Sequence, residues 1–319
     1  MNFDRLGFPI PPEFDRPADD SPAPRPRDTE AAAGRRGRPG PAKRIVLVAV
    51  LLGLIVPALV APAVMPSVRL AVMQWSLERA ILREGRGALA PAVDDMTRAI
   101  AWGGPLLESD PTEKSRLLCW RAMLRIENRD ISAAVADASL AASIAPTAVQ
   151  PHKVLALAHA IRGDADAALA ASQAAVDLAG AGNPEALNHR AYMRALVGRD
   201  LEGALADIES ALGESGDGSP EFLDTRGFIL HLLGRQQEAL ADLNAAIDAA
   251  QEQRRRLVLL SGHVSSGELA YRLRAADHGL AVMHHHRGLA CRALGLERQA
   301  EQDLAIAEKK GFDPSRGIY

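Results

Sequence analysis

An alanine-rich segment recurs six times along this chain of 319 residues. Each copy begins with alanine, has an aliphatic or small residue four positions later, and has alanine again three positions after that. The first alanines stand at positions 92, 134, 168, 204, 239 and 300, so the central copies are 34, 36 and 35 residues apart. Positions four and three residues apart share one face of a helix, and small side chains there let a second helix approach closely. The pattern therefore predicts a repeated helical unit whose core forms by stacking.

A first helix and a glycine turn precede the alanines in the central copies. In the clearest copy Leu223, Gly227 and Leu230 are large, small and large, and Gly234 marks the turn. This arrangement resembles the tetratricopeptide repeat, a helix-turn-helix unit of about 34 residues. The resemblance runs from about residue 71 to residue 314 and implies an all-α solenoid of about six hairpins, with a concave wall built from the first helices. The packing positions that define the repeat are Ala168, Ala175, Ala204, Ala211, Ala239 and Ala246.

The same resemblance implies which side chains face the concave groove. One row of first-helix positions is apolar in every copy, and a mixed row runs beside it. We interpret the rows as a docking stripe for a peptide or helix of a protein partner, with Tyr192 and Phe228 as the best anchors because aromatic side chains dominate interface energies. The alternative is that the apolar row packs inside a tight superhelix. The candidate groove residues are Trp120, Met123, Leu157, His189, Tyr192, Phe228 and Leu289.

Residues 45–65 are 21 consecutive positions without a charged or polar side chain. At ~1.5 Å per residue such a helix crosses the ~30 Å hydrocarbon core, so we predict one transmembrane helix over residues 45–66. The alternatives are a buried helix, which nothing in the chain would cover, and a cleaved signal peptide, whose leader would be unusually long. Five basic residues precede the stretch within fourteen positions and three follow it within residues 66–85. This bias places the tail in the cytoplasm and the solenoid outside, in the periplasm of a bacterial inner membrane.

The chain therefore divides into three predicted regions. Residues 1–44 hold nine of the twenty prolines and are predicted to be a disordered, arginine-containing tail. This tail is either a solvated linker or, through Phe3, Phe8, Ile10 and Phe14, a short docking motif for a cytoplasmic partner. The transmembrane helix follows over 45–66, and the solenoid occupies 70–319. The last repeat spacing is 61 residues, which predicts a non-repeat insertion around 251–284.

Motifs that carry chemistry are not found in the sequence. The metalloprotease, nucleophile-elbow, P-loop and dinucleotide patterns are missing. His284, His285 and His286 with His278 are a metal-like cluster, but consecutive residues of a helix point ~100° apart and cannot easily share one ion. A net charge of −3 and only 4% aromatic residues argue against a nucleic-acid partner. We therefore expect no enzymatic activity, no metal, no cofactor and no small-molecule substrate.

The function that these features favour is a membrane-anchored scaffold that docks a segment of a protein partner in the concave groove. The identity of the partner does not follow from the fold. Two alternatives stay open at this point: a structural subunit of an obligate membrane complex, and an enzyme that uses the 251–284 segment.

Overall fold

The computed structural model describes residues 64–215, 219–259 and 266–312, and every regular element in them is a helix. Most of the predicted transmembrane helix, residues 45–63, and the predicted tail lie outside the described residues. Within the described ranges no helix is long and apolar enough to cross a membrane. A first helix covers residues 64–85 and is called helix 64–85 below. The others are α2 (Leu89–Ser109), α3 (Pro111–Glu127), α4 (Ile131–Ile144), α5 (Val149–Arg162), α6 (Ala165–Ala179), α7 (Pro184–Leu196), α8 (Leu201–Ser215), α9 (Pro220–Leu232), α10 (Gln236–Leu259), α11 (Ser266–Ala293) and α12 (Glu297–Lys309).

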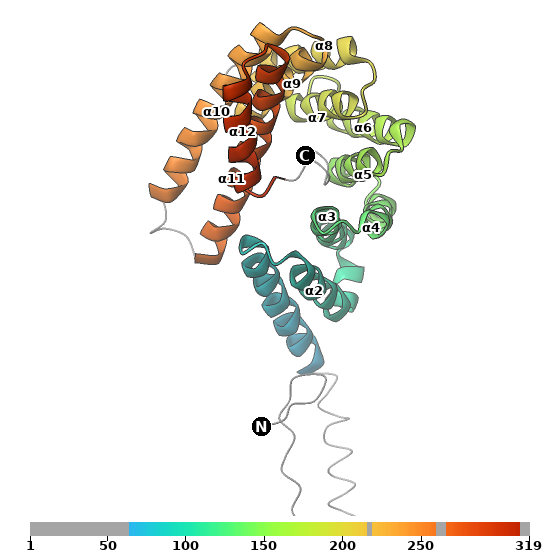
Figure 1. The fold of residues 1–319 in the computed structure, drawn as a ribbon. Coiled ribbons are helices and arrows are strands. Elements are labelled where there is room, and N and C mark those ends of the chain that lie inside the picture. Colours follow the sequence, from blue (N-terminus) through green and yellow to red (C-terminus); the bar gives the residue numbers. More distant parts are fainter. Residues whose placement is uncertain (1–63, 216–218, 260–265, 313–319) are drawn as a thin grey trace, which may run out of the picture. The chain divides into compact units, whose positions relative to one another are not determined.

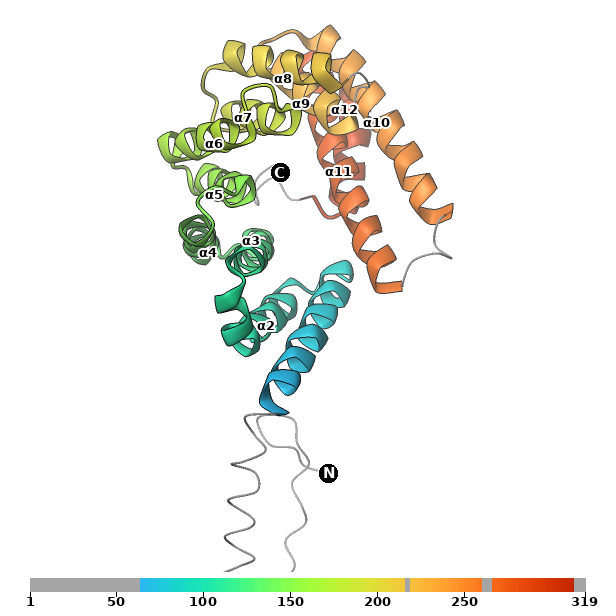
Figure 2. The ribbon, with the colours of Figure 1, turned by 180° about the vertical axis from the view of Figure 1, so that it is seen from behind.

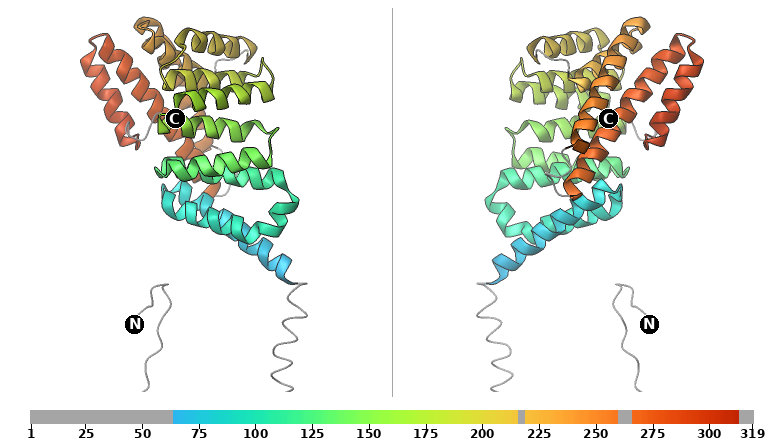
Figure 3. Two further views of the ribbon diagram at one scale, coloured as in Figure 1. Left: turned by 90° about the vertical axis from the view of Figure 1, so that its right-hand side faces the viewer. Right: turned by 90° about the vertical axis from the view of Figure 1, so that its left-hand side faces the viewer.

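Consecutive helices pair into antiparallel hairpins that stack side by side (Figures 1 and 3). Helix 64–85 pairs with α2 through a shared apolar cluster. The later pairs are α3 with α4, α5 with α6, α7 with α8, α9 with α10 and α11 with α12. The described residues thus form six hairpins, and the predicted all-α solenoid is confirmed.

The alanine positions lie at the helix–helix interfaces of these hairpins. The six packing alanines, from Ala168 to Ala246, are fully buried, as are Ile208 and Leu243 between them. The partner helix supplies matching space, because Gly227 of α9 lies directly under Leu243: a Cβ built on this glycine would be 2.7 Å from the leucine Cγ. Gly288 of α11 relates to Leu304 in the same way, at 2.9 Å. Small residues on one helix and a leucine on the other therefore set the spacing of the hairpin.

Local signals fix where the helices begin and end. Asp110 caps α3 and Asn183 caps α7, each accepting a hydrogen bond from a backbone N–H of the first turn. Proline opens α3, α7 and α9, where its missing N–H costs nothing. Gly163 ends α5 in the left-handed conformation, with φ of 89°.

A second repeat feature, which the sequence analysis missed, is an arginine–aspartate pair inside most hairpins. The arginine is on the first helix, and the aspartate is on the second helix, directly before the middle residue of the alanine triplet. In α7 and α8, Arg190 donates two hydrogen bonds to Asp207 at 2.6 and 2.7 Å. Arg194 adds a third at 2.7 Å, which explains a large cation at a first-helix position. The equivalent pairs are Arg79–Asp95, Arg121–Asp137, Arg226–Asp242 and Arg287–Asp303.

The last hairpin returns to the first. α11 is 28 residues long, and its N-terminal half, within the predicted 251–284 insertion, lies beside the end of helix 64–85 (Figures 1 and 2). Arg274 of α11 donates a 2.7 Å hydrogen bond to Glu127 of α3, across 147 positions of sequence. Gly85 lies so close to α11 that a Cβ on it would be 2.9 Å from the backbone nitrogen of Tyr271. We call this set of contacts the closure; it converts the row of hairpins into a ring.

Candidate partner-binding groove

The predicted groove residues divide into a buried group and an accessible group. Phe228 and Leu157 are buried, at 5% and 8% exposure. Trp120 and Met123 of α3, Tyr192 of α7 and Leu289 of α11 are partly buried. The groove register therefore brings these side chains to the inner side of the hairpins but does not leave all of them accessible.

Phe228 is covered by α11. Its ring stacks on that of His286 with centroids 4.1 Å apart, and the ring centroid of Tyr192 lies 6.3 Å from that of Phe228. His286 is fully buried, and its Nδ1 lies 2.9 Å from a carboxylate oxygen of Asp224. Phe228 therefore contributes to the packing between α9 and α11, which agrees with the packing alternative for this member of the row.

His189, another predicted groove residue, is neutral. Its Nδ1 is buried and has no hydrogen-bond partner among the described residues. Burial, with a smaller contribution from the neighbouring Lys153 ammonium, lowers the pKa of His189 to about 3. The side chain is therefore neutral at physiological pH and presents a polar but uncharged edge.

The accessible part of the groove lies where α3 faces the N-terminal half of α11. A cavity of about 850 Å³ is lined there by Ile81, Leu82, Trp120 and Tyr271. A second cavity of about 360 Å³ adjoins these residues and includes Met123 and His278. We call the two cavities together the α3–α11 cleft. Of the predicted groove residues, Trp120 and Met123 line it; Tyr271 was missed, because its position depends on the closure rather than on the repeat.

Charged side chains of both signs surround the apolar floor of the cleft. Arg116 is paired with Glu113 and Arg272 with Glu268, each through a hydrogen bond of 2.6 Å within its own helix. The Arg274–Glu127 pair of the closure also borders the smaller cavity. Paired charges of opposite sign therefore border the apolar floor.

Glu84 is a carboxyl group of the cleft whose pKa is strongly shifted. It is buried, and its carboxylate accepts a 2.8 Å hydrogen bond from the indole Nε1 of Trp120. Burial raises its pKa from the ordinary 4.5 to about 7, and the nearby Glu127 adds to this, while the Trp120 hydrogen bond opposes it. Glu84 therefore changes its charge near neutral pH, next to Trp120 in the lining of the cleft.

His284, His285 and His286 of α11 pack and form hydrogen bonds inside the fold. The Nδ1 of His284 lies 2.7 Å from Asp303, and the ring of His285 packs against Phe312 at 4.4 Å. Among the described residues no group of three histidine, cysteine or acidic side chains is placed to hold a metal ion. Cys119 and Cys291 are buried, and burial raises the pKa of the Cys119 thiol to about 11. Within this part of the chain, these side chains are occupied in packing and hydrogen bonds.

Comparison with known proteins gives distant structural likenesses. The sequence matches no protein-family model and no curated protein. Its structure is similar to that of a tetratricopeptide repeat protein from Parabacteroides merdae, with 16% identity and a TM-score of 0.44 over 76% of this chain and 94% of that chain. A thermophilic TPR protein of Thermus thermophilus is similar at 20% identity and a TM-score of 0.47, over 64% of this chain and 98% of that chain. The Cut9–Hcn1 hetero-tetramer of the APC/C is similar at 16% identity and a TM-score of 0.48, over 76% of this chain and 46% of that chain.

Proposed function

We propose that the chain is a membrane-anchored scaffold that holds a segment of a protein partner in the α3–α11 cleft. The observation that supports this function is the cleft itself, a large concave space with an aromatic and aliphatic floor and a rim of paired charges. Such sites bury an apolar anchor and orient it through a few polar contacts at the edge.

The anchors that we propose differ from the pair predicted from the sequence, Tyr192 and Phe228. Phe228 and Leu157 are already buried by neighbouring helices, so a partner gains little by contacting them. Trp120, Tyr271 and Met123 line the open space and keep apolar surface available. The partner segment that fits presents an aliphatic or aromatic side chain to this floor and polar groups to the arginine–glutamate pairs at the rim.

The membrane anchor is the second component of the proposal. The uncharged stretch of residues 45–65 supports a single transmembrane helix over 45–66, and the basic bias in front of it supports a cytoplasmic tail and a periplasmic solenoid. Carbonate extraction should leave the full-length chain in the membrane pellet. An export-dependent phosphatase fused after Tyr319 should be active. Release of the intact chain by carbonate contradicts the anchor, and an inactive phosphatase with a fluorescent cytoplasmic reporter contradicts the topology.

Site-specific photocrosslinking in native membranes tests the docking function. A photoreactive phenylalanine analogue replaces Tyr271 or Ile81 in the cleft, and Leu259 serves as the control because it is 80% exposed at the end of α10, outside the cleft. We expect one discrete adduct of higher mass from both cleft positions and none from position 259. Equal adducts at all three positions, or none at either cleft position, would show that the partner does not dock there.

A further inference from the structure

Helix 64–85 carries an exposed apolar stripe at its N-terminal end. Val64, Val68 and Trp75 are 46%, 38% and 49% exposed. Together with the exposed Ala71 they follow each other at intervals of four, three and four residues, which places them on one face of the helix. Met73 and Ser76 on the opposite side are buried against α2. The stripe is therefore a second apolar face, flanked by the exposed Met65 and Leu70, and no helix among the described residues covers it.

α2 adds exposed apolar side chains at the same end of the hairpin. Gly103 of α2 lies against Met73, since a Cβ on it would be 2.7 Å from the methionine sulfur. The N-terminal half of helix 64–85 therefore runs beside the C-terminal half of α2. On α2, Trp102 is 37% exposed and Leu106, one turn later, is 36% exposed. We call the exposed side chains of the two helices the hairpin-1 surface: Val64, Val68, Ala71, Trp75, Trp102 and Leu106.

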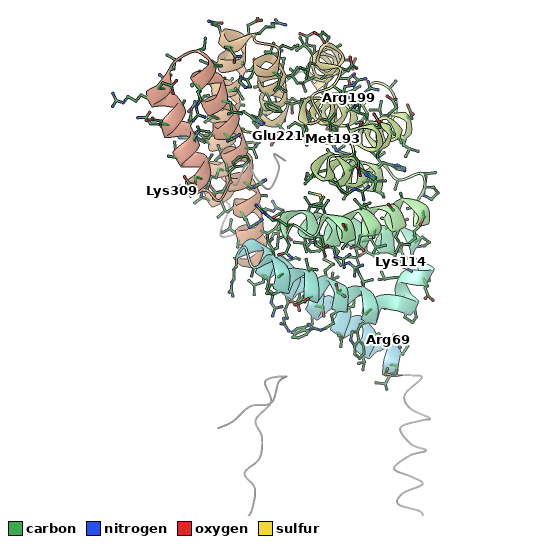
Figure 4. All side chains as sticks on the ribbon, turned by 45° about the vertical axis from the view of Figure 1, so that its right-hand side comes forward. Arg69, Lys114, Met193, Arg199, Glu221 and Lys309 are labelled. Carbon is green, nitrogen blue, oxygen red and sulfur yellow. The ribbon has the colours of Figure 1, made fainter. Side chains whose placement is uncertain are left out.

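The chemistry of the hairpin-1 surface is that of a membrane interface. Two of the three tryptophans of the chain belong to it, and tryptophan is enriched where headgroups meet hydrocarbon. The guanidinium of Arg79 lies 4.2 Å from the ring centre of Trp75, and Arg69 is near the N-terminal end of the helix (Figure 4). No acidic residue occurs from residue 64 to 77 or from 98 to 107. A surface that combines tryptophan, aliphatic and arginine side chains without acids suits lipid headgroups.

Position in the chain indicates which lipid surface this is. Helix 64–85 begins within the last residues of the uncharged stretch 45–65, so the hairpin-1 surface follows the proposed transmembrane helix without a linker. Trp75 is about 15 Å along the helix from the end of that stretch, at ~1.5 Å per residue. The polar layer on one side of a bilayer is only about 5–8 Å thick. Trp75 can therefore stay at headgroup depth only if helix 64–85 turns away from the membrane normal and lies along the surface.

We propose that the hairpin-1 surface rests on the lipid bilayer, so that the first hairpin lies along the membrane and the ring is held at a fixed inclination to it. This proposal rests on the proposed anchor and goes beyond it, because an anchor alone leaves the solenoid free to rotate above the membrane. The occupant of the surface is lipid at headgroup depth, and not a second copy of the chain or a partner protein.

The tryptophans supply a direct test with an internal control. Three variants of the full chain each keep one tryptophan, Trp75, Trp102 or Trp120, and have phenylalanine at the other two positions. They are reconstituted in nanodiscs of phosphatidylcholine and phosphatidylglycerol, with and without a lipid that carries a shallow nitroxide quencher. Trp75 and Trp102 should lose most of their fluorescence to the nitroxide lipid. Trp120, which is bonded to Glu84 inside the cleft, should keep most of its own.

A thiol probe gives a second readout that leaves the tryptophans intact. Native Cys119 and Cys291 are buried, with raised pKa values that suppress labelling. A fluorescent label on Val68→Cys therefore reports the stripe, and a label on Leu259→Cys reports an exposed site on α10. Quenching by nitroxide lipid at position 68 and not at position 259 supports the proposal.

Three other outcomes would contradict the proposal. Full chain that stays with the nanodiscs but shows no lipid quenching at Trp75, Trp102 or position 68 overturns the proposal and leaves the anchor intact. Protection of these sites from aqueous acrylamide without lipid quenching shows that protein covers the surface, which also overturns it. Failure of the full chain to remain with nanodiscs or to resist carbonate overturns the anchor and this proposal together.

Discussion

The central hairpins and the closure are held together by different kinds of contact. Between α7 and α8, alanines and Ile208 are fully buried, and the arginine–aspartate pair joins residues 17 positions apart. At the closure, the ion pair joins residues 147 positions apart, and cavities of about 850 and 360 Å³ remain beside it. Dense apolar packing is worth several kcal/mol per large side chain, whereas partly exposed ion pairs contribute little. The hairpins are therefore the stable part of the ring, and the closure is the part that opens first.

The largest expected effect comes from emptying a hairpin core. Leu243→Ala should lower the free energy of unfolding by about 2–5 kcal/mol, because a fully buried leucine that fills the space over Gly227 leaves a cavity. Tyr271→Ala at the closure should cost much less, since this side chain is 39% exposed. Thermal and denaturant unfolding measure both. A larger loss for Tyr271→Ala would reverse the proposed order of stability.

Two glycine-to-alanine changes sharpen the comparison at a smaller scale. Gly227→Ala should destabilise by about 1–3 kcal/mol, since the added methyl overlaps Leu243 and the hairpin has to separate. Gly279→Ala in α11 meets no atom within 4 Å, so it should stabilise by up to about 1 kcal/mol through helix propensity alone. Both are read from urea unfolding midpoints. Equal effects of the two changes would mean that the small residue of α9 does not set the hairpin spacing.

The free energy of unfolding should depend on pH through Glu84, which precedes the closure residue Gly85. Its pKa is raised to about 7 in the folded chain and is 4.5 ordinarily, so the folded state binds the proton more readily. The stabilising contribution of the protonated carboxyl is complete below pH 4.5 and is lost as the pH rises through about 7. Glu84→Gln, which keeps an acceptor for Trp120, should therefore be more stable than the parent at pH 8 by about 1–3 kcal/mol, with the difference vanishing toward pH 4.5.

The control for this pH effect is Glu78→Gln. Glu78 lines the same cleft on the same helix but is exposed. Glu78→Gln removes a carboxylate from the same helix without changing a buried side chain, so it is the matched comparison for Glu84→Gln. An unaltered pH profile for Glu84→Gln would show that Glu84 titrates at its ordinary pKa.

The smallest effect on global stability is expected from the closure ion pair. Arg274→Ala should change the free energy of unfolding by less than about 1 kcal/mol, because both partners are partly exposed. Hydrogen–deuterium exchange should nevertheless rise in residues 266–276 and at the end of helix 64–85, and stay unchanged in α7 and α8. Uniform exchange along the ring would mean that the closure and the hairpins open as one unit.

The sequence predicts the parts of the fold that repeat. Ala239 and Gly227 could be interpreted directly, because their contacts lie within one hairpin and the same spacing returns in the neighbouring copies. The arginine–aspartate pairs carry an equally regular signal: Arg79 and Asp95 are 16 positions apart, as are Arg121 and Asp137. This spacing was available in the sequence and was overlooked.

The candidate site could be predicted only in part, because it depends on contacts that do not repeat. Trp120 and Met123 were found from the groove register, and both line the cleft. The burial of Phe228 depends on His286, which is bonded to Asp224 across 62 positions, and no period relates these residues. Tyr271 enters the cleft because α11 extends beyond the length of a repeat helix and reaches helix 64–85. Such long-range placement follows from the whole ring and not from any one copy.

The closure also has a mechanical consequence. In an open row of hairpins the two ends move independently, because each hairpin can tilt slightly on its neighbour. Once Arg274 and Glu127 join the ends, a tilt at one interface has to be compensated at the others, so the ring is stiffer than the open row. Bending of the row can therefore widen or narrow the α3–α11 cleft only if the Arg274–Glu127 pair or the close approach of Gly85 to Tyr271 yields as well.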